Sequence, residues 1–150
     1  MRAQETHLRV LLEGSKQYRI PLFQRPYSWQ TEQWQALWDD IVEIYEQSQE
    51  KGLQHGHFLG PVVSKALTGT PEGIAPYMVI DGQQRLTTLS ILLAALRDAL
   101  KGEETNLPEK IQDQCLTNRY VSGNDHFKVL PTQADRESFF SVAAAEGAKT

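Results

Sequence analysis

Apolar positions recur along this chain with two different periods, and together they predict a mixed α and β architecture. The most regular helical stripe predicts a helix over residues 31–49, with one face buried in the core. That face consists of Trp34, Leu37, Trp38, Ile41, Ile44 and Tyr45. A leucine stripe predicts a second helix over 85–101, and shorter helices are expected over 4–13, over 108–121 and from residue 135 onward.

Short apolar runs predict strands over 18–23, 57–67, 77–80 and 127–130. Pro21 cannot donate to a sheet ladder, so the first strand is expected at an edge or a bulge. Turn residues over 68–73 favour antiparallel pairing of the second and third strands. The predicted fold class is therefore α+β, with a small mixed sheet and packed helices. A single domain is expected over residues 1–142, followed by a flexible tail over 143–150.

A dense polar turn separates the strand at 77–80 from the leucine-rich helix. It reads Asp81-Gly82-Gln83-Gln84-Arg85-Leu86-Thr87-Thr88. A helix N-terminus carries partial positive charge and unpaired N–H groups, so phosphate is a natural ligand there. Gly82 would allow close approach, Arg85 would pair with phosphate, and Asp81 would hold a metal or orient a water. The alternative is that Asp81 or Thr87 caps the helix while Arg85 pairs with a surface acid.

A second polar cluster follows the strand at 18–23, with the sequence Gln24-Arg25-Pro26-Tyr27-Ser28-Trp29. Both strand ends thus carry a Gln–Arg pair. If the two strands belong to one sheet, Arg25 and Arg85 would converge on one pocket. The alternative for Tyr27 and Trp29 is simple packing beneath the following helix.

Composition narrows the choice of function. The chain is 40% hydrophobic and 23% charged, as in ordinary globular proteins, and no apolar run reaches the roughly 20 residues that span a bilayer. The net charge of −4 argues against DNA binding by bulk electrostatics. A local basic pocket is still compatible with it, because four basic residues lie near predicted strand ends: Arg19, Arg25, Lys65 and Arg85.

The lone cysteine, Cys115, excludes an internal disulfide, and a cytoplasmic location is expected. His55 and His57 lack a third ligand at fixed spacing, so a loop role is favoured over a metal site.

Three segments, in order, resemble the GmrSD-type N-terminal domain, which is ParB/sulfiredoxin-like. They are residues 20–29, 58–63 and 79–89, and the resemblance spans about residues 8 to 140. This family occurs in type IV, modification-dependent restriction enzymes and in the phosphorothioate-sensing effector SspE.

The resemblance implies hydrolysis of a nucleoside triphosphate, GTP or ATP, with Mg²⁺. The catalytic candidates are Asp81, Gln83, Gln84 and Arg85, and Asp81 is the candidate Mg²⁺ ligand. The nucleotide-binding candidates are Gly82, Arg85, Thr87, Thr88 and Arg25. The candidates for reading modified DNA are Gln24, Arg25, Tyr27 and Trp29. The resemblance also implies a separate C-terminal nuclease domain, commonly of the HNH type; no such pattern follows residue 100.

Three hypotheses remain open. The chain is a nucleotide-hydrolysing sensor of an antiviral restriction effector, a pocket that binds modified DNA without turnover, or a ParB-like nuclease. The third ranks last because nucleases usually combine several carboxylates or a histidine at one metal, and Asp81 stands nearly alone.

Overall fold

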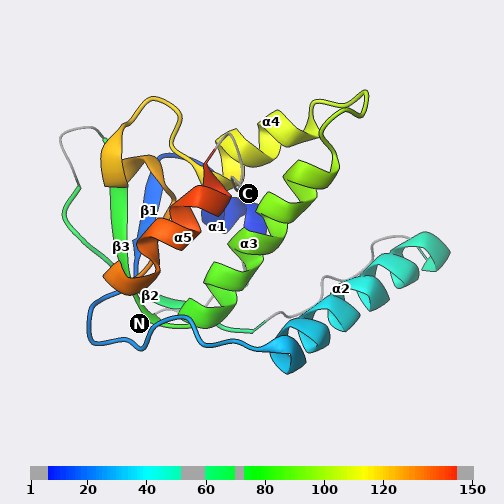
Figure 1. Cartoon of the computed structure of the whole chain (residues 1–150), viewed down its shortest axis with the longest axis horizontal. Helices are drawn as coiled ribbons and strands as arrows, with labels where there is room; N and C mark the ends of the chain where they lie inside the picture. The colour runs from blue at the N-terminus through cyan, green and yellow to red at the C-terminus, as the bar shows by residue number, and fades with distance from the viewer. Residues whose placement is uncertain (1–6, 52–59, 70–72, 145–150) are drawn as a thin grey trace.

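The computed structural model describes residues 7–51, 60–69 and 73–144. In this part of the chain, four strands form one mixed sheet with helices packed against it (Figure 1). The strands are β1 (Lys16–Arg19), β2 (Val63–Ala66), β3 (Ala75–Asp81) and β4 (Val129–Leu130), in the order β2-β3-β1-β4. β1 runs parallel to β3 and β4, whereas β2 is antiparallel to β3. The predicted fold class and the predicted antiparallel pair are both confirmed.

Five α-helices complete the described structure: α1 (Leu8–Leu12), α2 (Thr31–Lys51), α3 (Gln83–Ala99), α4 (Leu107–Ile111) and α5 (Gln133–Ala143). A π-helical turn, Gln112–Leu116, extends α4, and a 3-10 turn, Gly123–His126, precedes β4. Parts of the predictions for residues 4–13, 57–67, 68–73 and the tail fall on residues 4–6, 57–59, 70–72 and 145–150, which lie outside the described residues.

The prediction of a helix over 108–121 is wrong beyond Leu116. Thr117 pairs instead with Phe127 in an isolated antiparallel bridge. The Asn118 N–H then donates to the His126 carbonyl at 2.6 Å, so the backbone bonds that a longer helix would use go to a neighbouring segment.

The first strand also differs from its prediction in position and environment. β1 ends at Arg19 and lies inside the sheet between β3 and β4, rather than at an edge. Its neighbour Ile20 still donates its N–H to the Leu130 carbonyl at 2.9 Å. Pro21 has no N–H to continue the ladder, and the chain turns there, with the Gln24 N–H bonded to the Pro21 carbonyl at 3.0 Å.

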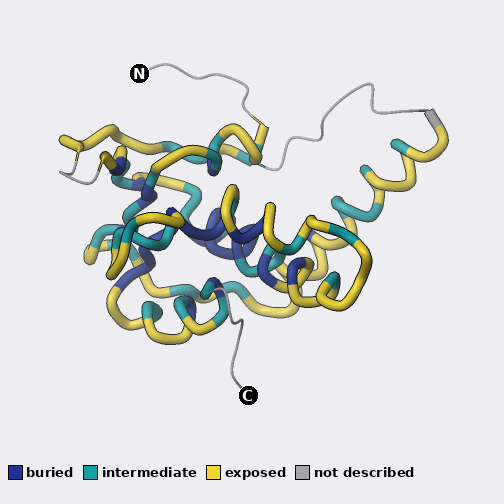
Figure 2. Tube along the Cα trace, turned by 90° about the horizontal axis from the view of Figure 1, so that it is seen from above, coloured by how far each residue is buried: buried dark blue, intermediate teal, exposed yellow. Residues whose placement is uncertain are grey.

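The main core lies between the sheet and helices α1, α3 and α5. Its buried members are Leu12, Tyr18, Ile20, Val79, Leu86, Val129, Phe139 and Ala143. Figure 2 shows that buried residues concentrate along α3 and the sheet, while α2 is exposed or half-buried along most of its length. The first turns of α3 are therefore anchored in the core, whereas the last two residues of β3, Ile80 and Asp81, are exposed.

The predicted core face of α2 is mostly wrong. Only Leu37 is buried, whereas Trp34, Trp38 and Tyr45 are 45%, 52% and 63% exposed. The helix leaves the body of the domain as a long arm (Figure 1), so only its first turns meet other described elements. The regular apolar stripe correctly indicates an amphipathic helix, but no described element covers the whole stripe.

A buried arginine ties the far end of α3 to the end of α5. Arg97 is 1% exposed, and its guanidinium donates to the carbonyls of Val142 and Ala144 at 2.8 and 3.0 Å. It also pairs with Asp98 at 3.0 Å, and this hydrogen bond lowers the pKa of the Asp98 carboxyl. The last carbonyls of α5 thereby gain charged hydrogen-bond partners in the interior.

Candidate functional site

The predicted polar turn lies between the end of β3 and the start of α3. Gly82 joins the two elements in a left-handed conformation, with φ of 91°, which glycine adopts without steric cost. The Asp81 carboxylate accepts the Gly82 N–H at 2.9 Å. No side chain of the described residues caps the α3 N-terminus, and Thr87 donates to the Gln83 carbonyl at 2.8 Å instead. The capping alternative is therefore wrong, and the first-turn N–H groups of α3 keep their positive potential for a ligand.

The segment Gly60–Val62 packs directly on this turn through two glycines. A Cβ atom on Gly82 would lie 2.6 Å from the Pro61 carbonyl oxygen. A Cβ atom on Gly60, where φ is 114°, would lie 2.5 Å from Nη1 and 2.7 Å from Nε of Arg85. The Arg85 guanidinium thus rests against the bare α-carbon of Gly60, and any larger residue there would displace it.

The loop 24–29 is fastened to the same turn by two glutamines. Gln24 donates to the Ile80 carbonyl at 3.0 Å and accepts from Gln83 Nε2 at 2.9 Å. Gln84 is buried; it accepts from the Ser28 N–H at 2.7 Å and donates to the Pro26 carbonyl at 3.1 Å. Three segments that are distant in sequence therefore meet at one junction, at the carboxyl ends of β1 and β3.

A relay of hydroxyl groups lies beneath this loop. Trp34 Nε1 donates to the Tyr27 hydroxyl at 2.8 Å, and that hydroxyl lies 2.6 Å from Thr88 Oγ1. Thr88 in turn donates to the Gln84 carbonyl at 2.8 Å. Because each group has one proton, the donors run from Trp34 through Tyr27 and Thr88 to the backbone. The hydroxyl groups of Thr87 and Thr88 thus both donate to backbone carbonyls of α3, so neither has a proton left to donate to a ligand.

The guanidinium groups of Arg25 and Arg85 have no described partner, and the Asp81 carboxylate accepts only the N–H of the adjacent Gly82 among the described groups. Arg85 is half-buried, and Arg25 and Asp81 are exposed. Among the described residues, none forms a hydrogen bond or ion pair with the guanidinium of Arg25 or Arg85. The alternative of an Arg85–acid pair is therefore not observed in this part of the chain.

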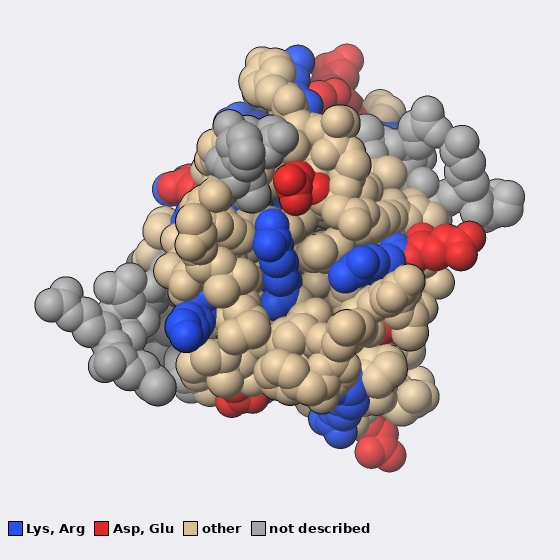
Figure 3. All heavy atoms as spheres, turned by 90° about the vertical axis from the view of Figure 1, so that its left-hand side faces the viewer, with Lys and Arg blue, Asp and Glu red and all other residues tan. Residues whose placement is uncertain are grey.

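The other two basic residues lie away from the junction or are engaged by other side chains. Arg19 donates to Gln17 Oε1 at 2.8 Å and pairs with Asp125 at 3.7 Å, and Lys65 lies exposed on β2. On the face shown in Figure 3, basic side chains lie apart from one another, and some of them lie beside acidic side chains. That distribution agrees with the net charge of −4 and favours local anion binding over a broad electrostatic surface.

The junction offers a single carboxylate, that of Asp81, as a donor for a metal ion. The described residues contain no group of three or more His, Cys, Asp or Glu side chains that would hold a metal ion. Mg²⁺ commonly uses one or two carboxylates together with substrate phosphates, and Asp81 supplies one such carboxylate. His55 and His57 lie outside the described residues.

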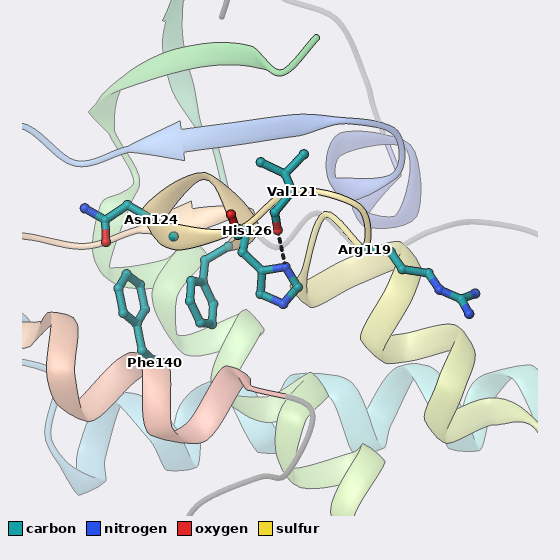
Figure 4. A pocket seen from close by; sticks show the side chains of 8 residues that line it. Arg119, Val121, Asn124, His126 and Phe140 are labelled. Carbon is teal, nitrogen blue, oxygen red and sulfur yellow. Dashed lines mark hydrogen bonds between the residues drawn. The ribbon is translucent and has the colours of Figure 1, made fainter. Parts of the chain in front are cut away.

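A cavity of about 550 Å³, away from the junction, was not predicted from the sequence. It is lined by residues around the 3-10 turn and by Phe140 (Figure 4). His126 Nδ1 lies 2.7 Å from the Val121 carbonyl oxygen and 3.0 Å from that of Asn118, which fixes the ring. The cavity lies before the start of β4, at the opposite end of β1 and β4 from the junction. It shares no residue with the predicted site, and no periodic signal in the sequence marks these loop residues.

The fold and the site define a small α+β domain in which three separate segments build a polar junction at a helix N-terminus. The chain belongs to the family described as GmrSD restriction endonuclease, N-terminal domain, whose model matches residues 8–149. The predicted family is thus confirmed, and membership connects the chain to DNA restriction, with DNA as a partner of the full protein. Comparison with curated proteins gave no significant match. No helix among the described residues is long and apolar enough to cross a bilayer.

Proposed function

We propose that this chain is the sensor domain of a modification-dependent restriction effector, and that it binds and hydrolyses GTP or ATP. One observation carries the proposal: three separate segments meet at the start of α3, and they leave Arg85 and Asp81 without partners among the described charged groups. Family membership supports restriction as the setting. The nucleotide step rests on the chemistry of the junction.

The first step is binding of the triphosphate. Phosphate oxygens accept hydrogen bonds from the first-turn N–H groups of α3 and from the guanidinium of Arg85. Arg25, on the exposed loop, supplies a second positive charge from the other side. The missing side chain of Gly82 serves the packing of the turn, because Pro61 and Val62 fill the space where a Cβ atom would lie.

The second step is attack by water on the terminal phosphorus, which breaks the bond to the bridging oxygen and releases the nucleoside diphosphate and inorganic phosphate. The proton of the water passes to a phosphate oxygen or to solvent. Negative charge spreads over the transferred group's oxygens, and the fixed charge of Arg85 stabilises it. The Gln83 amide nitrogen donates to Gln24 and Oε1 has no described partner, so Oε1 accepts a hydrogen bond from the attacking water and orients it. Both ends of the Gln84 amide hold the loop, so we assign Gln84 to positioning the loop.

Asp81 would hold Mg²⁺ together with phosphate oxygens. When bound, the ion neutralises charge between neighbouring phosphates. The carboxylate is exposed and accepts only the adjacent Gly82 N–H among the described groups, so one of its oxygens is available.

Modified DNA is read by the loop 24–29. Arg25 is exposed and Trp29 is half-buried, whereas the Tyr27 hydroxyl is engaged in the relay. We therefore assign contacts with the altered group to Arg25, Trp29 and the ring of Tyr27. Because Gln24 bonds to Gln83, the DNA-reading loop and the nucleotide turn move as one unit. Cleavage belongs to a separate nuclease domain.

The test is equilibrium binding of GTP and of ATP to the wild-type chain and to Arg85→Ala. Arg9→Ala is the matched control, because its side chain is 74% exposed on α1, outside the junction. The proposal predicts saturable binding that is lost in Arg85→Ala and kept in Arg9→Ala. Equal binding by all three proteins would overturn the assignment of this junction.

A companion measurement separates the proposal from a pocket that reads DNA without turnover. Binding of matched modified and unmodified duplexes is measured at one salt concentration. Preference for the modified duplex together with no nucleotide binding would favour a pocket that reads modified DNA without hydrolysing a nucleotide.

A further inference from the structure

The side chain of Gln24 binds a backbone carbonyl just beyond the paired part of β1 and β3. Pairing between these strands ends at Arg19 and Met78, so the carbonyl of Ile80 lies past their ladder. Gln24 Nε2 donates to this carbonyl at 3.0 Å. The main chain of Gln24 is held as well, because its N–H closes a tight turn on the Pro21 carbonyl at 3.0 Å. Backbone groups therefore fix both the main chain and the side chain of Gln24.

The Ile80 carbonyl determines which way two successive side-chain amides face. A backbone carbonyl only accepts hydrogen bonds, so Gln24 must direct its NH2 group toward Ile80. The amide oxygen of Gln24 then faces Gln83. Because that oxygen also only accepts, Gln83 must direct its own NH2 group to Gln24, at 2.9 Å. Through Gln24, the backbone thus leaves Oε1 as the end of the Gln83 amide that has no described partner.

The orientation of the Gln83 amide decides what it can do to a water molecule. An amide oxygen accepts a hydrogen bond from the water and leaves the lone pairs of the water oxygen free for attack on phosphorus. An NH2 group would instead donate to the water oxygen and compete for a lone pair that the attack uses. The two ends of an amide are nearly alike in shape, so packing alone would not select the useful orientation.

The other two glutamines of the junction have no amide end to offer to a water. Gln84 is buried, and its amide binds the backbone of Ser28 and Pro26 at its two ends. Gln24 is a sequence candidate for reading modified DNA, yet both ends of its amide have partners inside the domain. Among these three side chains, only Gln83 has an amide end without a described partner.

We propose that Gln24 is a positioning residue for nucleotide hydrolysis, which holds the Gln83 amide with its oxygen available to the attacking water. This inference rests on the proposed function of the junction, and it concerns the rate of the step rather than nucleotide affinity. The bonds are those of the hydrolysis itself: phosphorus gains the water oxygen and loses the bridging oxygen. Neither glutamine gains or loses a proton. Gln24 therefore acts through Gln83 and needs no contact with the nucleotide.

The test measures nucleotide affinity by equilibrium titration, and kcat by release of inorganic phosphate from saturating GTP or ATP with Mg²⁺. Gln24→Met keeps the length of the side chain and removes both hydrogen bonds. It should lower kcat about tenfold or more and keep nucleotide affinity within about twofold of wild type, because only the orientation of the water changes. Gln47→Met is the matched control, at an exposed amide on α2 outside the junction, and should keep wild-type kcat and affinity.

Gln24→Lys separates amide orientation from attachment of the loop. Lysine still donates to the Ile80 carbonyl, but it offers no acceptor, so Gln83 would turn its oxygen toward the ammonium group. The proposal predicts a loss of kcat at least as large as in Gln24→Met, in a protein whose loop remains attached. If Gln24 only tethered the loop, Gln24→Lys would keep wild-type kcat.

A double-mutant cycle tests whether the two glutamines act as one unit. Gln83→Met alone should lower kcat at least as far as Gln24→Met does. Adding Gln24→Met to Gln83→Met should lower kcat by no more than about a further twofold, because the group through which Gln24 acts is already gone. Circular dichroism confirms that each variant is folded.

Several results would overturn the proposal. They are wild-type kcat in folded Gln24→Met, Gln24→Lys or Gln83→Met, and a double variant in which the two single losses multiply. Weakened nucleotide binding with unchanged kcat in Gln24→Met would also overturn it, because Gln24 would then contact the nucleotide. These results leave the proposed function standing, since the wild-type chain still releases phosphate. No release by the wild-type chain overturns the proposed function, and this inference with it.

Discussion

The contact between Gly60 and Arg85 gives the sharpest test of how the junction is built. In Gly60→Ala, the new Cβ would fall 2.5 Å from Arg85 Nη1, closer than such atoms approach. The guanidinium is the end of a long side chain, so it should move while the backbone stays. Gly60 also has φ of 114°, which costs a non-glycine residue about 1–3 kcal/mol.

The two costs appear in different measurements. The backbone strain lowers the free energy of unfolding by about 1–3 kcal/mol. Moving the guanidinium removes charge-assisted hydrogen bonds to phosphate worth about 1.5–3 kcal/mol, which weakens nucleotide binding about 10- to 150-fold. Nucleotide titration and thermal unfolding of the same samples measure both effects.

Gly102→Ala is the matched control for this prediction. Gly102 has φ of 91°, so alanine there is strained as well, but its Cβ would meet nothing within 4 Å. Gly102→Ala should lose stability and keep its nucleotide affinity. If Gly60→Ala binds nucleotide as wild type does, or if both variants weaken binding equally, then Gly60 does not position Arg85.

Three further predictions concern the framework around the site. Gln84→Leu should lower the free energy of unfolding by about 1–3 kcal/mol, because loop backbone groups lose their partners; a loop unchanged in protease sensitivity would contradict this. Arg97→Met should lower the free energy of unfolding in denaturant by at least about 3 kcal/mol, because carbonyls at the end of α5 lose their donor. A decrease below about 1 kcal/mol would contradict the role of Arg97 in anchoring α5. Burial raises the pKa of Tyr18 to about 12 from 10.0, so the folded state keeps a proton that the unfolded chain releases. Stability should therefore fall between about pH 10 and 12, by up to about 3 kcal/mol, and Tyr18→Phe should remove that part of the fall; identical slopes in both proteins would contradict it.

The sequence predicted the α+β class and the polar junction because both depend on local signals. Apolar runs mark β3 and α3, and the turn between them is too polar for packing alone. The meeting of the two Gln–Arg clusters was predicted only on the condition that their strands belong to one sheet. The structure meets that condition, because β1 and β3 pair in parallel and therefore end at the same edge.

Other features depend on contacts that local patterns do not record. Helical period shows that α2 is amphipathic, but it cannot show whether anything covers the apolar face, and Trp38 is half exposed. The Gln84 side chain bonds residues that lie 56 and 58 positions away. The resting place of Arg85 on Gly60 likewise appears only when β2 and its preceding segment fold against α3.

The central claim is that the junction at the start of α3 hydrolyses a nucleoside triphosphate. Its most direct test is release of inorganic phosphate from GTP and from ATP, with Mg²⁺, by the wild-type chain and by Asp81→Ala, Arg85→Ala and Arg9→Ala. We predict release by wild type and Arg9→Ala, loss in Arg85→Ala, and loss in Asp81→Ala with some nucleotide binding retained. No release by the wild-type chain, or undiminished release by folded Arg85→Ala, would contradict the claim.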